Sequence, residues 1–274
     1  MTNPSIKIAA AQSASTACDK TANLETLRLL CESASGNGAN LIVFPELFLT
    51  GYSAGERFRD LAEASDGPAF EAVSKVAQSC RIAICYGYPE RDGEKVFNAA
   101  QLVGPDGNSL GNHRKTHLYG TYERQWFDAG QSFVDPIMFN GITINILICY
   151  EIEFPEVARV MARQGNSILL VPTATGFENN PNMLAQTLVR ARAAENHFFV
   201  AYANHAAGET GLDLNGHSVI AGPFGKIAAE SHGDDQEVIC CDFSIEEVFE
   251  SRRVNPYMRD LREDILSNQN ARDI

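Results

Sequence analysis

The chain has 274 residues, of which 45% are hydrophobic and 21% are charged, the balance of a globular protein with a full core. Its formal net charge of −13 argues against a nucleic-acid partner, because such binding needs a basic footprint. The chain does not open on a signal-like segment, and no apolar run approaches the roughly 20 residues that span a bilayer, so we expect a cytoplasmic protein without a membrane partner.

The first hundred residues alternate strand and helix patterns. Residues 6–11 predict a strand at the edge of the fold, and apolar residues at helical spacing then predict a helix that ends near Gly36. The apolar run 41–44 predicts a buried strand, and Pro68 predicts the start of a second helix. Two further strands are expected at 82–88 and 97–103.

Strand and helix patterns also interleave in the rest of the chain, after a loop-like segment at 108–136. Strands are expected at 142–148, 168–171, 199–203, 217–221 and 237–242, and helices at 155–165, 183–196 and 244–252. This alternation indicates an α/β layered fold with mixed sheets. No linker rich in Pro, Gly or Ser interrupts it, so we predict one domain over residues 1–274, with a polar tail from about residue 255.

The seven cysteines do not suggest a disulfide framework, because their number is odd and their spacing irregular. No Cys-X-X-Cys pair or Cys/His cluster has zinc spacing, so no metal is expected. Most of the cysteines lie in apolar contexts and are interpreted as small core residues.

Three apolar strands end in residues that can carry chemistry. Residues 41–44 lead to Glu46, residues 146–148 lead to Cys149, and residues 168–171 lead to Thr173 and Ala174. Ligands of open α/β sheets bind beyond the carboxyl ends of the strands. A carboxylate and a thiol at two such ends could therefore face one crevice.

Each of these residues also has an ordinary structural interpretation. A cysteine after an apolar strand is usually a core residue, but Cys149 enters a turn before a helix, whose dipole would favour a thiolate. Glu46 could cap or pair on the surface, whereas its apolar neighbours would raise its pKa toward that of a general base. Lys115 lies in a basic run that could be a solvated charged face.

Taken together, the three segments resemble the nitrilase, or carbon–nitrogen hydrolase, superfamily. The motifs that carry the resemblance are residues 44–52 (FPELFLTGY), 113–118 (HRKTHL) and 148–156 (ICYEIEFPE), with further matches at 190–196, 216–218 and 222–225. The similarity covers roughly residues 5 to 260, and the three blocks in this order are specific, although each alone is weak.

The resemblance implies a Glu-Lys-Cys triad made of Glu46, Lys115 and Cys149, with Glu123 as a second glutamate. It implies a four-layer α-β-β-α sandwich with two mixed sheets, and a homodimer or larger homo-oligomer. No cofactor is implied. In such a site the Cys149 thiolate would attack the carbonyl carbon while Lys115 and the Tyr150 backbone N–H hold the oxyanion. Lys115 would also help to lower the pKa of the thiol.

The expected reaction is hydrolysis of a small linear carboxamide to a carboxylic acid and ammonia through a thioester. Tyr150 stands where nitrilases usually carry a tryptophan, which favours an amidase. Hydrolysis of an N-carbamoyl compound or a nitrile by the same triad, and transfer of the acyl group to an amine, stay open. A non-catalytic binding or redox-sensing protein is disfavoured, because a site without activity has no need of all four residues, Glu46, Lys115, Cys149 and Glu123.

The substrate is less well defined by the sequence than the reaction. Glu153 occupies a position where many relatives have a basic residue, and Glu151 lies nearby, so an amine-bearing amide is one hypothesis. An equally good interpretation is that both glutamates lie behind the residues that touch the substrate, or on the surface. Residues expected to line the pocket are Tyr52, Tyr119, Trp126, Tyr150, Glu153, Thr173 and Ala174. The aromatic ones could equally be core residues.

Overall fold

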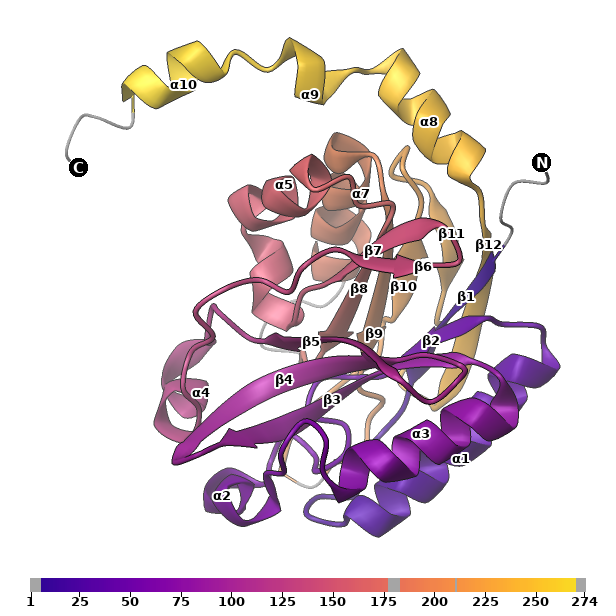
Figure 1. Ribbon diagram of the computed structural model, residues 1–274, viewed down its shortest axis with the longest axis vertical. Helices are drawn as coiled ribbons and strands as arrows, with labels where there is room; N and C mark the ends of the chain where they lie inside the picture. The colour runs from indigo at the N-terminus through magenta and orange to yellow at the C-terminus, as the bar shows by residue number, and fades with distance from the viewer. Residues whose placement is uncertain (1–5, 177–182, 210, 270–274) are drawn as a thin grey trace.

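Two six-stranded mixed sheets lie between two layers of helices in the computed structural model, which describes residues 6–176, 183–209 and 211–269 (Figure 1). The first sheet has the strand order β12-β1-β2-β3-β4-β5, and the second has the order β11-β10-β9-β8-β7-β6. The four-layer α-β-β-α sandwich expected from the resemblance is therefore confirmed.

The strands of the first sheet are β1 (Ile6–Gln12), β2 (Leu41–Val43), β3 (Ala83–Asp92), β4 (Lys95–Val103), β5 (Ser109–Arg114) and β12 (Glu237–Phe243). Those of the second are β6 (Ile137–Phe139), β7 (Ile142–Ile146), β8 (Ile168–Thr173), β9 (Phe199–Asn204), β10 (Val219–Ala221) and β11 (Ile227–Glu230). Strand β1 lies between β12 and β2, so its predicted place at an edge was wrong.

Helices cover the outer face of each sheet. The first sheet carries α1 (Lys20–Gly36) and α3 (Pro68–Cys80), and the second carries α5 (Pro155–Arg163), the π-helix η4 (Leu184–Val189) and α7 (Arg190–Asn196). The remaining helices are η1 (Gly55–Arg57), α2 (Phe58–Leu61), α4 (Gly120–Trp126), η2 (Cys149–Glu153), α8 (Ile245–Val254), α9 (Tyr257–Asp260) and α10 (Glu263–Gln269).

Alternation along the buried strands divides the core into three layers. Val43 of β2 and Leu170 of β8 point into the space between the two sheets. Their neighbours Ile42 and Leu169 point outward, toward the helices over their own sheets. Because both faces are covered, these strands are apolar throughout, and each fully buried large side chain stabilises the fold by about 1.5–3 kcal/mol.

The segment 108–136 differs most from the sequence-based expectation. It contains β5 and α4, where a loop was predicted. Strand β5 is an edge strand with polar, half-buried residues, so it lacks the apolar pattern of an internal strand. Strands β6 and β11 were also missed. Helical spacing in α5 also predicts that Val160 points inward, but its side chain is 37% exposed.

The last three helices run as an arm along the outside of the molecule (Figure 1). The arm touches the body through an ion pair of 2.6 Å between Arg163 and Glu263 and through the stacked rings of His197 and Tyr257. The division into one domain with a tail from about residue 255 stays a prediction, and residues 270–274 of that tail lie outside the described residues. No helix in the described part of the chain is long and apolar enough to cross a membrane.

Candidate active site

Glu46 lies at the point where the ends of the two sheets meet. It follows β2 of the first sheet, and its backbone N–H donates to the Thr173 carbonyl at the end of β8 in the second sheet (3.3 Å). On the other side, the backbone approaches β3 so closely that a Cβ at Gly87 would lie 2.8 Å from the Glu46 Cα. Glycine at this position is what allows the Glu46 segment to lie against the sheet.

Lys115 follows the edge strand β5 and reaches the same point. Its Nζ donates to Glu46 Oε1 and to Glu123 Oε1, both at 2.6 Å, and all three side chains are fully buried. Three residues that are 69 and 8 positions apart along the chain therefore form one cluster in the interior. Buried charges are tolerated only when they are paired and hydrogen-bonded, as they are here.

The Glu46 carboxyl is suited to exchange protons near neutrality. Burial raises its pKa to about 7, while Lys115 and a hydrogen bond from Asn98 Nδ2 (2.7 Å) oppose the rise. Both of these donors bind Oε1. Oε2 has no hydrogen-bond partner among the described residues, although it is buried. One oxygen is thus fixed and the other is free to take a proton.

The ammonium of Lys115 stays charged in this setting. Burial alone would lower its pKa, but the carboxylates of Glu123 and Glu46 outweigh burial and raise it above the ordinary lysine value. Glu46 and Glu123 accept one N–H each, and an ammonium has three. No other described residue accepts from this ammonium, so a third donor of a fixed cation is available to a ligand.

Glu123, on α4, is held by more than the lysine. Tyr52 donates its hydroxyl to Glu123 Oε1 (2.7 Å), and the Tyr119 backbone N–H donates to Oε2 (2.8 Å). Burial raises the pKa of Tyr52 far above its usual range, so the phenol stays protonated and donates. Glu123 is thereby fixed in the orientation that places Lys115.

Cys149 follows β7 at the start of the 3₁₀ helix η2. Its φ of +48° is a left-handed conformation that a non-glycine residue rarely adopts, and such strain is common at functional turns. Its Sγ lies 3.8 Å from both the Ala174 carbonyl oxygen and Thr175 Oγ1. The Thr173 carbonyl that accepts the Glu46 N–H belongs to the residue before Ala174, so the sulfur lies near the segment that bears Glu46.

The expectation of a lowered thiol pKa was wrong. Burial and the negative charge of Glu46 raise the pKa of Cys149 well above its ordinary value, although Lys115 acts in the opposite direction. The resting side chain is therefore a neutral thiol. It needs a base beside it to become a nucleophile, and Glu46 is the carboxylate with a suitable pKa.

The residues expected to line a pocket have different surroundings. Tyr150 contacts Tyr119 and Phe154 edge to face, with centroids 5.1 and 4.8 Å apart. Trp126 is partly buried against the cluster around α2 and α4. The Thr173 hydroxyl is buried and donates to the Val171 carbonyl. Their roles toward a substrate stay predictions.

Several residues of the site were missed from the sequence. Asn98 holds Glu46, and Thr175 contacts the Cys149 sulfur and lies 3.2 Å from the Tyr202 hydroxyl. Asn98 is one of two polar residues, with Gln101, in the mostly apolar segment 97–103, which was a usable signal. Thr175 has no such signature. Within the described residues, no group of three or more His, Cys, Asp or Glu side chains could hold a metal ion.

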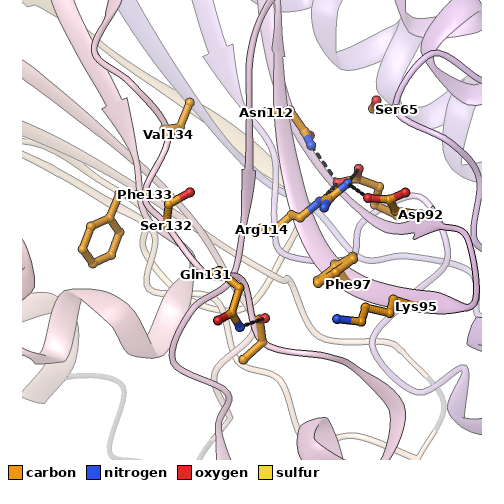
Figure 2. A pocket seen from close by; sticks show the side chains of 12 residues that line it. Ser65, Asp92, Lys95, Phe97, Asn112, Arg114, Gln131, Ser132, Phe133 and Val134 are labelled. Atoms are coloured by element: carbon orange, nitrogen blue, oxygen red, sulfur yellow. Dashed lines mark hydrogen bonds and ion pairs between the residues drawn. The ribbon is translucent and has the colours of Figure 1, made fainter.

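A separate cavity of about 460 Å³ opens beside β5 (Figure 2). Its polar part is a set of paired charges. Arg114 forms ion pairs with Asp92 and with the buried Glu90, and Asn112 donates to Glu90 Oε2. Figure 2 shows these side chains on one side and Phe133 and other residues of the following segment on the other. The cavity shares no lining residue with the cluster around Lys115.

Comparisons with known proteins identify relatives of this chain. The model of a family described as carbon-nitrogen hydrolase matches residues 7–253. The sequence is 39% identical over 257 residues to a protein described as a hydrolase in the pqqF 5′ region of Pseudomonas protegens, covering 93% of this chain and 88% of that protein. It is 31% identical to an (R)-stereoselective amidase of a Pseudomonas species, covering 81% and 80%, and to an omega-amidase of Danio rerio, covering 90% and 92%.

Solved structures give the same result. The crystal structure of an amidase from Nesterenkonia sp. superposes with a TM-score of 0.86 at 29% identity, over 96% of each chain. In a glutamate-to-glutamine variant of that amidase, the acetamide moiety of fluoroacetamide is attached covalently to the active-site cysteine.

Proposed function

The chain belongs to the carbon–nitrogen hydrolase family, and we propose that it is an amidase that hydrolyses a small linear carboxamide to a carboxylic acid and ammonia. One observation carries this proposal: Glu46, Lys115 and Glu123 form a buried cluster, and the Cys149 sulfur lies against Ala174, the residue after the Thr173 whose carbonyl accepts the Glu46 N–H. The amidases among its relatives support the choice of amides.

The first half of the proposed reaction forms a thioester. Glu46 Oε2 takes the thiol proton as Cys149 Sγ attacks the carbonyl carbon of the amide. The oxyanion that develops is held by the third N–H of Lys115 and by the backbone N–H of Tyr150. Glu46 then returns the proton to the nitrogen, the C–N bond breaks, and ammonia leaves.

The second half regenerates the enzyme. Glu46, again ionised, takes a proton from a water molecule that attacks the thioester carbon. The same two donors hold the second oxyanion, and the C–S bond breaks as Cys149 recovers its proton. Water and amide are consumed, and acid and ammonia are formed. Every proton transfer in this account uses Glu46, whose pKa of about 7 suits both directions.

The test of this function is release of ammonia from a panel of amides, nitriles and N-carbamoyl compounds. The proposal expects turnover of amides with equal amounts of acid and ammonia. Carbon dioxide released together with ammonia would identify an N-carbamoyl hydrolase, and turnover of nitriles alone would identify a nitrilase. Formation of a hydroxamate on addition of hydroxylamine would show that amines can also accept the acyl group.

An amine-bearing substrate is the finer part of this proposal, and Glu153 supports it. Burial raises the pKa of this half-buried carboxyl, and Lys115 is close enough to oppose the rise. We expect Glu153→Gln to lower kcat/KM about tenfold for an amino amide, the effect of one charge-assisted hydrogen bond, and not for its uncharged isostere. Initial rates on the two amides test this. Glu156→Gln, an exposed carboxylate in the same segment, is the control.

The cytoplasmic location and the homo-oligomeric assembly are also part of the proposal. They are supported by the family resemblance. Cell fractionation tests the location. Light scattering of the purified protein tests the assembly, and a mass of a single 29.9 kDa chain would contradict it.

A further inference from the structure

A second buried carboxylate lies two residues after Cys149, and the proposed reaction does not use it. The side chain of Glu151 is fully buried and accepts four hydrogen bonds. Oε2 accepts from the Ile148 backbone N–H (2.7 Å) and from His113 Nε2 (2.8 Å). Oε1 accepts from the backbone N–H (2.7 Å) and the hydroxyl (2.6 Å) of Thr116. Glu151 is therefore not free to bind a substrate amine, and that part of the sequence-based hypothesis was wrong.

The four donors come from the two segments that bear the reacting groups. Ile148 directly precedes Cys149 at the end of β7 in the second sheet. His113 and Thr116 flank Lys115 at the end of β5 in the first sheet. One carboxylate thus connects the turn that bears the sulfur to the segment that bears the ammonium. Among the described residues, no other side chain binds both segments in this way.

The Glu151 carboxylate is ionised at any pH at which an amidase works. Burial alone would raise its pKa, but His113, Thr116 and the Ile148 N–H lower it to about 2. An ionised carboxylate only accepts hydrogen bonds, so His113 Nε2 must carry its proton. Hydrogen bonds to a buried carboxylate are short and strong, which makes the connection stiff.

Such a connection matters because both partners need support. Lys115 follows an edge strand, which has a neighbouring strand on one side only. Cys149 has a strained backbone with a φ of +48°. The oxyanion is held only if the ammonium and the sulfur keep their separation, and a misplacement of about 1 Å can cost about 100-fold in rate.

We propose that Glu151 is a positioning residue that fixes the Lys115 ammonium relative to the Cys149 thiol. It acts through Thr116 and His113 on one side and the Ile148 N–H on the other, and it does not touch the substrate. This inference rests on the proposed amide hydrolysis. The competing role is simple stabilisation of the fold, which would lower the melting temperature but leave the chemical step unchanged.

The primary test compares Thr116→Val with Thr116→Ser in steady-state hydrolysis of an amide that the wild type turns over. Valine keeps the shape and the backbone N–H but removes the hydroxyl donor to Glu151, whereas serine keeps that donor. We expect Thr116→Val to lower kcat about tenfold, the effect of one lost hydrogen bond to a charge, with KM within about twofold. Thr116→Ser should stay within about twofold of the wild type.

A second variant and a control complete the test. Glu151→Gln replaces one carboxylate oxygen by an amide N–H₂, which faces the donors that bind Glu151. We therefore expect kcat to fall about 100-fold at unchanged KM, measured well below the melting temperature of the variant. Thr116→Val also removes the acceptor of His117 Nδ1 (2.7 Å). His117→Phe removes that contact while keeping a ring beside Phe154, and it should leave kcat unchanged.

The outcomes separate this inference from the proposed function. A kcat loss in Thr116→Val and Glu151→Gln that serine restores at position 116 supports the positioning role. Unchanged kcat in both variants, or a change in KM without a change in kcat, overturns it. If Cys149→Ala still hydrolyses the amide, the proposed function itself fails. If Cys149→Ala is inactive while Thr116→Val and Glu151→Gln keep the wild-type kcat, only the positioning role fails.

Discussion

Replacement of Cys149 by alanine is expected to lower kcat for amide hydrolysis by at least about 10⁴-fold. Without the sulfur there is no group to form the thioester, and only binding and the oxyanion donors remain. The substitution removes one partly buried atom and breaks no ion pair, so the fold should persist. Ammonia release with a limit of detection below 10⁻⁴ of the wild-type rate, together with circular dichroism, measures both effects.

The matched control is Cys80→Ala, which removes another partly buried thiol, at the end of α3 on the outer face of the first sheet. It should keep the wild-type kcat. Iodoacetamide labelling gives an independent readout, because Glu46 can take the thiol proton, so Cys149 should be alkylated faster in the wild type than in Glu46→Gln. Substantial activity in Cys149→Ala would contradict a thioester mechanism at this residue.

Replacement of Glu46 by glutamine is expected to lower kcat/KM about 10³-fold, within the range found for general acid–base groups. The amide oxygen can still accept from Lys115 Nζ and Asn98 Nδ2, which both bind Oε1, so the cluster keeps its shape. What is lost is the basic Oε2, which has no partner among the described residues. Lys115→Met is less informative, because unpairing a buried charge costs about 3–5 kcal/mol of stability.

The pH profile gives the sign of the Glu46 effect. Burial raises the pKa of Glu46 to about 7, so the carboxyl is protonated below that pH and cannot accept the thiol proton. The wild-type kcat/KM should therefore fall about tenfold per pH unit on the acid side of pH 7. Glu46→Gln should lose this limb, whereas Glu71→Gln, at an exposed position on α3, should keep it. An identical acid limb in Glu46→Gln would assign the base to another group.

The internal strands could be predicted from the sequence because burial on both faces leaves a clear pattern. Strands β2 and β8 are continuous apolar runs, and Glu46 and Thr173 at their ends were found for that reason. Strand β5 has no such pattern, since an edge strand with half-buried polar residues resembles a loop. The strand order could not be predicted either, because it depends on pairings between segments far apart in the sequence, such as β1 with β12.

The candidate site was predictable in its residues and not in its electrostatics. Three motifs point to Glu46, Lys115 and Cys149, but a sequence does not reveal how deeply each charge is buried. Burial has the largest effect on the pKa of the Cys149 thiol, so this pKa rises although Lys115 lowers it. In the same way, Glu151 looks in the sequence like a possible substrate contact, whereas in the fold all its acceptor sites face protein donors.

The most direct test of the proposed chemistry is to stop turnover of an amide with acid and to measure the mass of the peptide that contains Cys149. The wild type should carry the acyl group of the substrate on this peptide, and the corresponding peptide of Cys149→Ala should carry none. An acyl group on a different residue, or an unmodified Cys149 peptide while the wild type turns over, would contradict the proposed thioester mechanism.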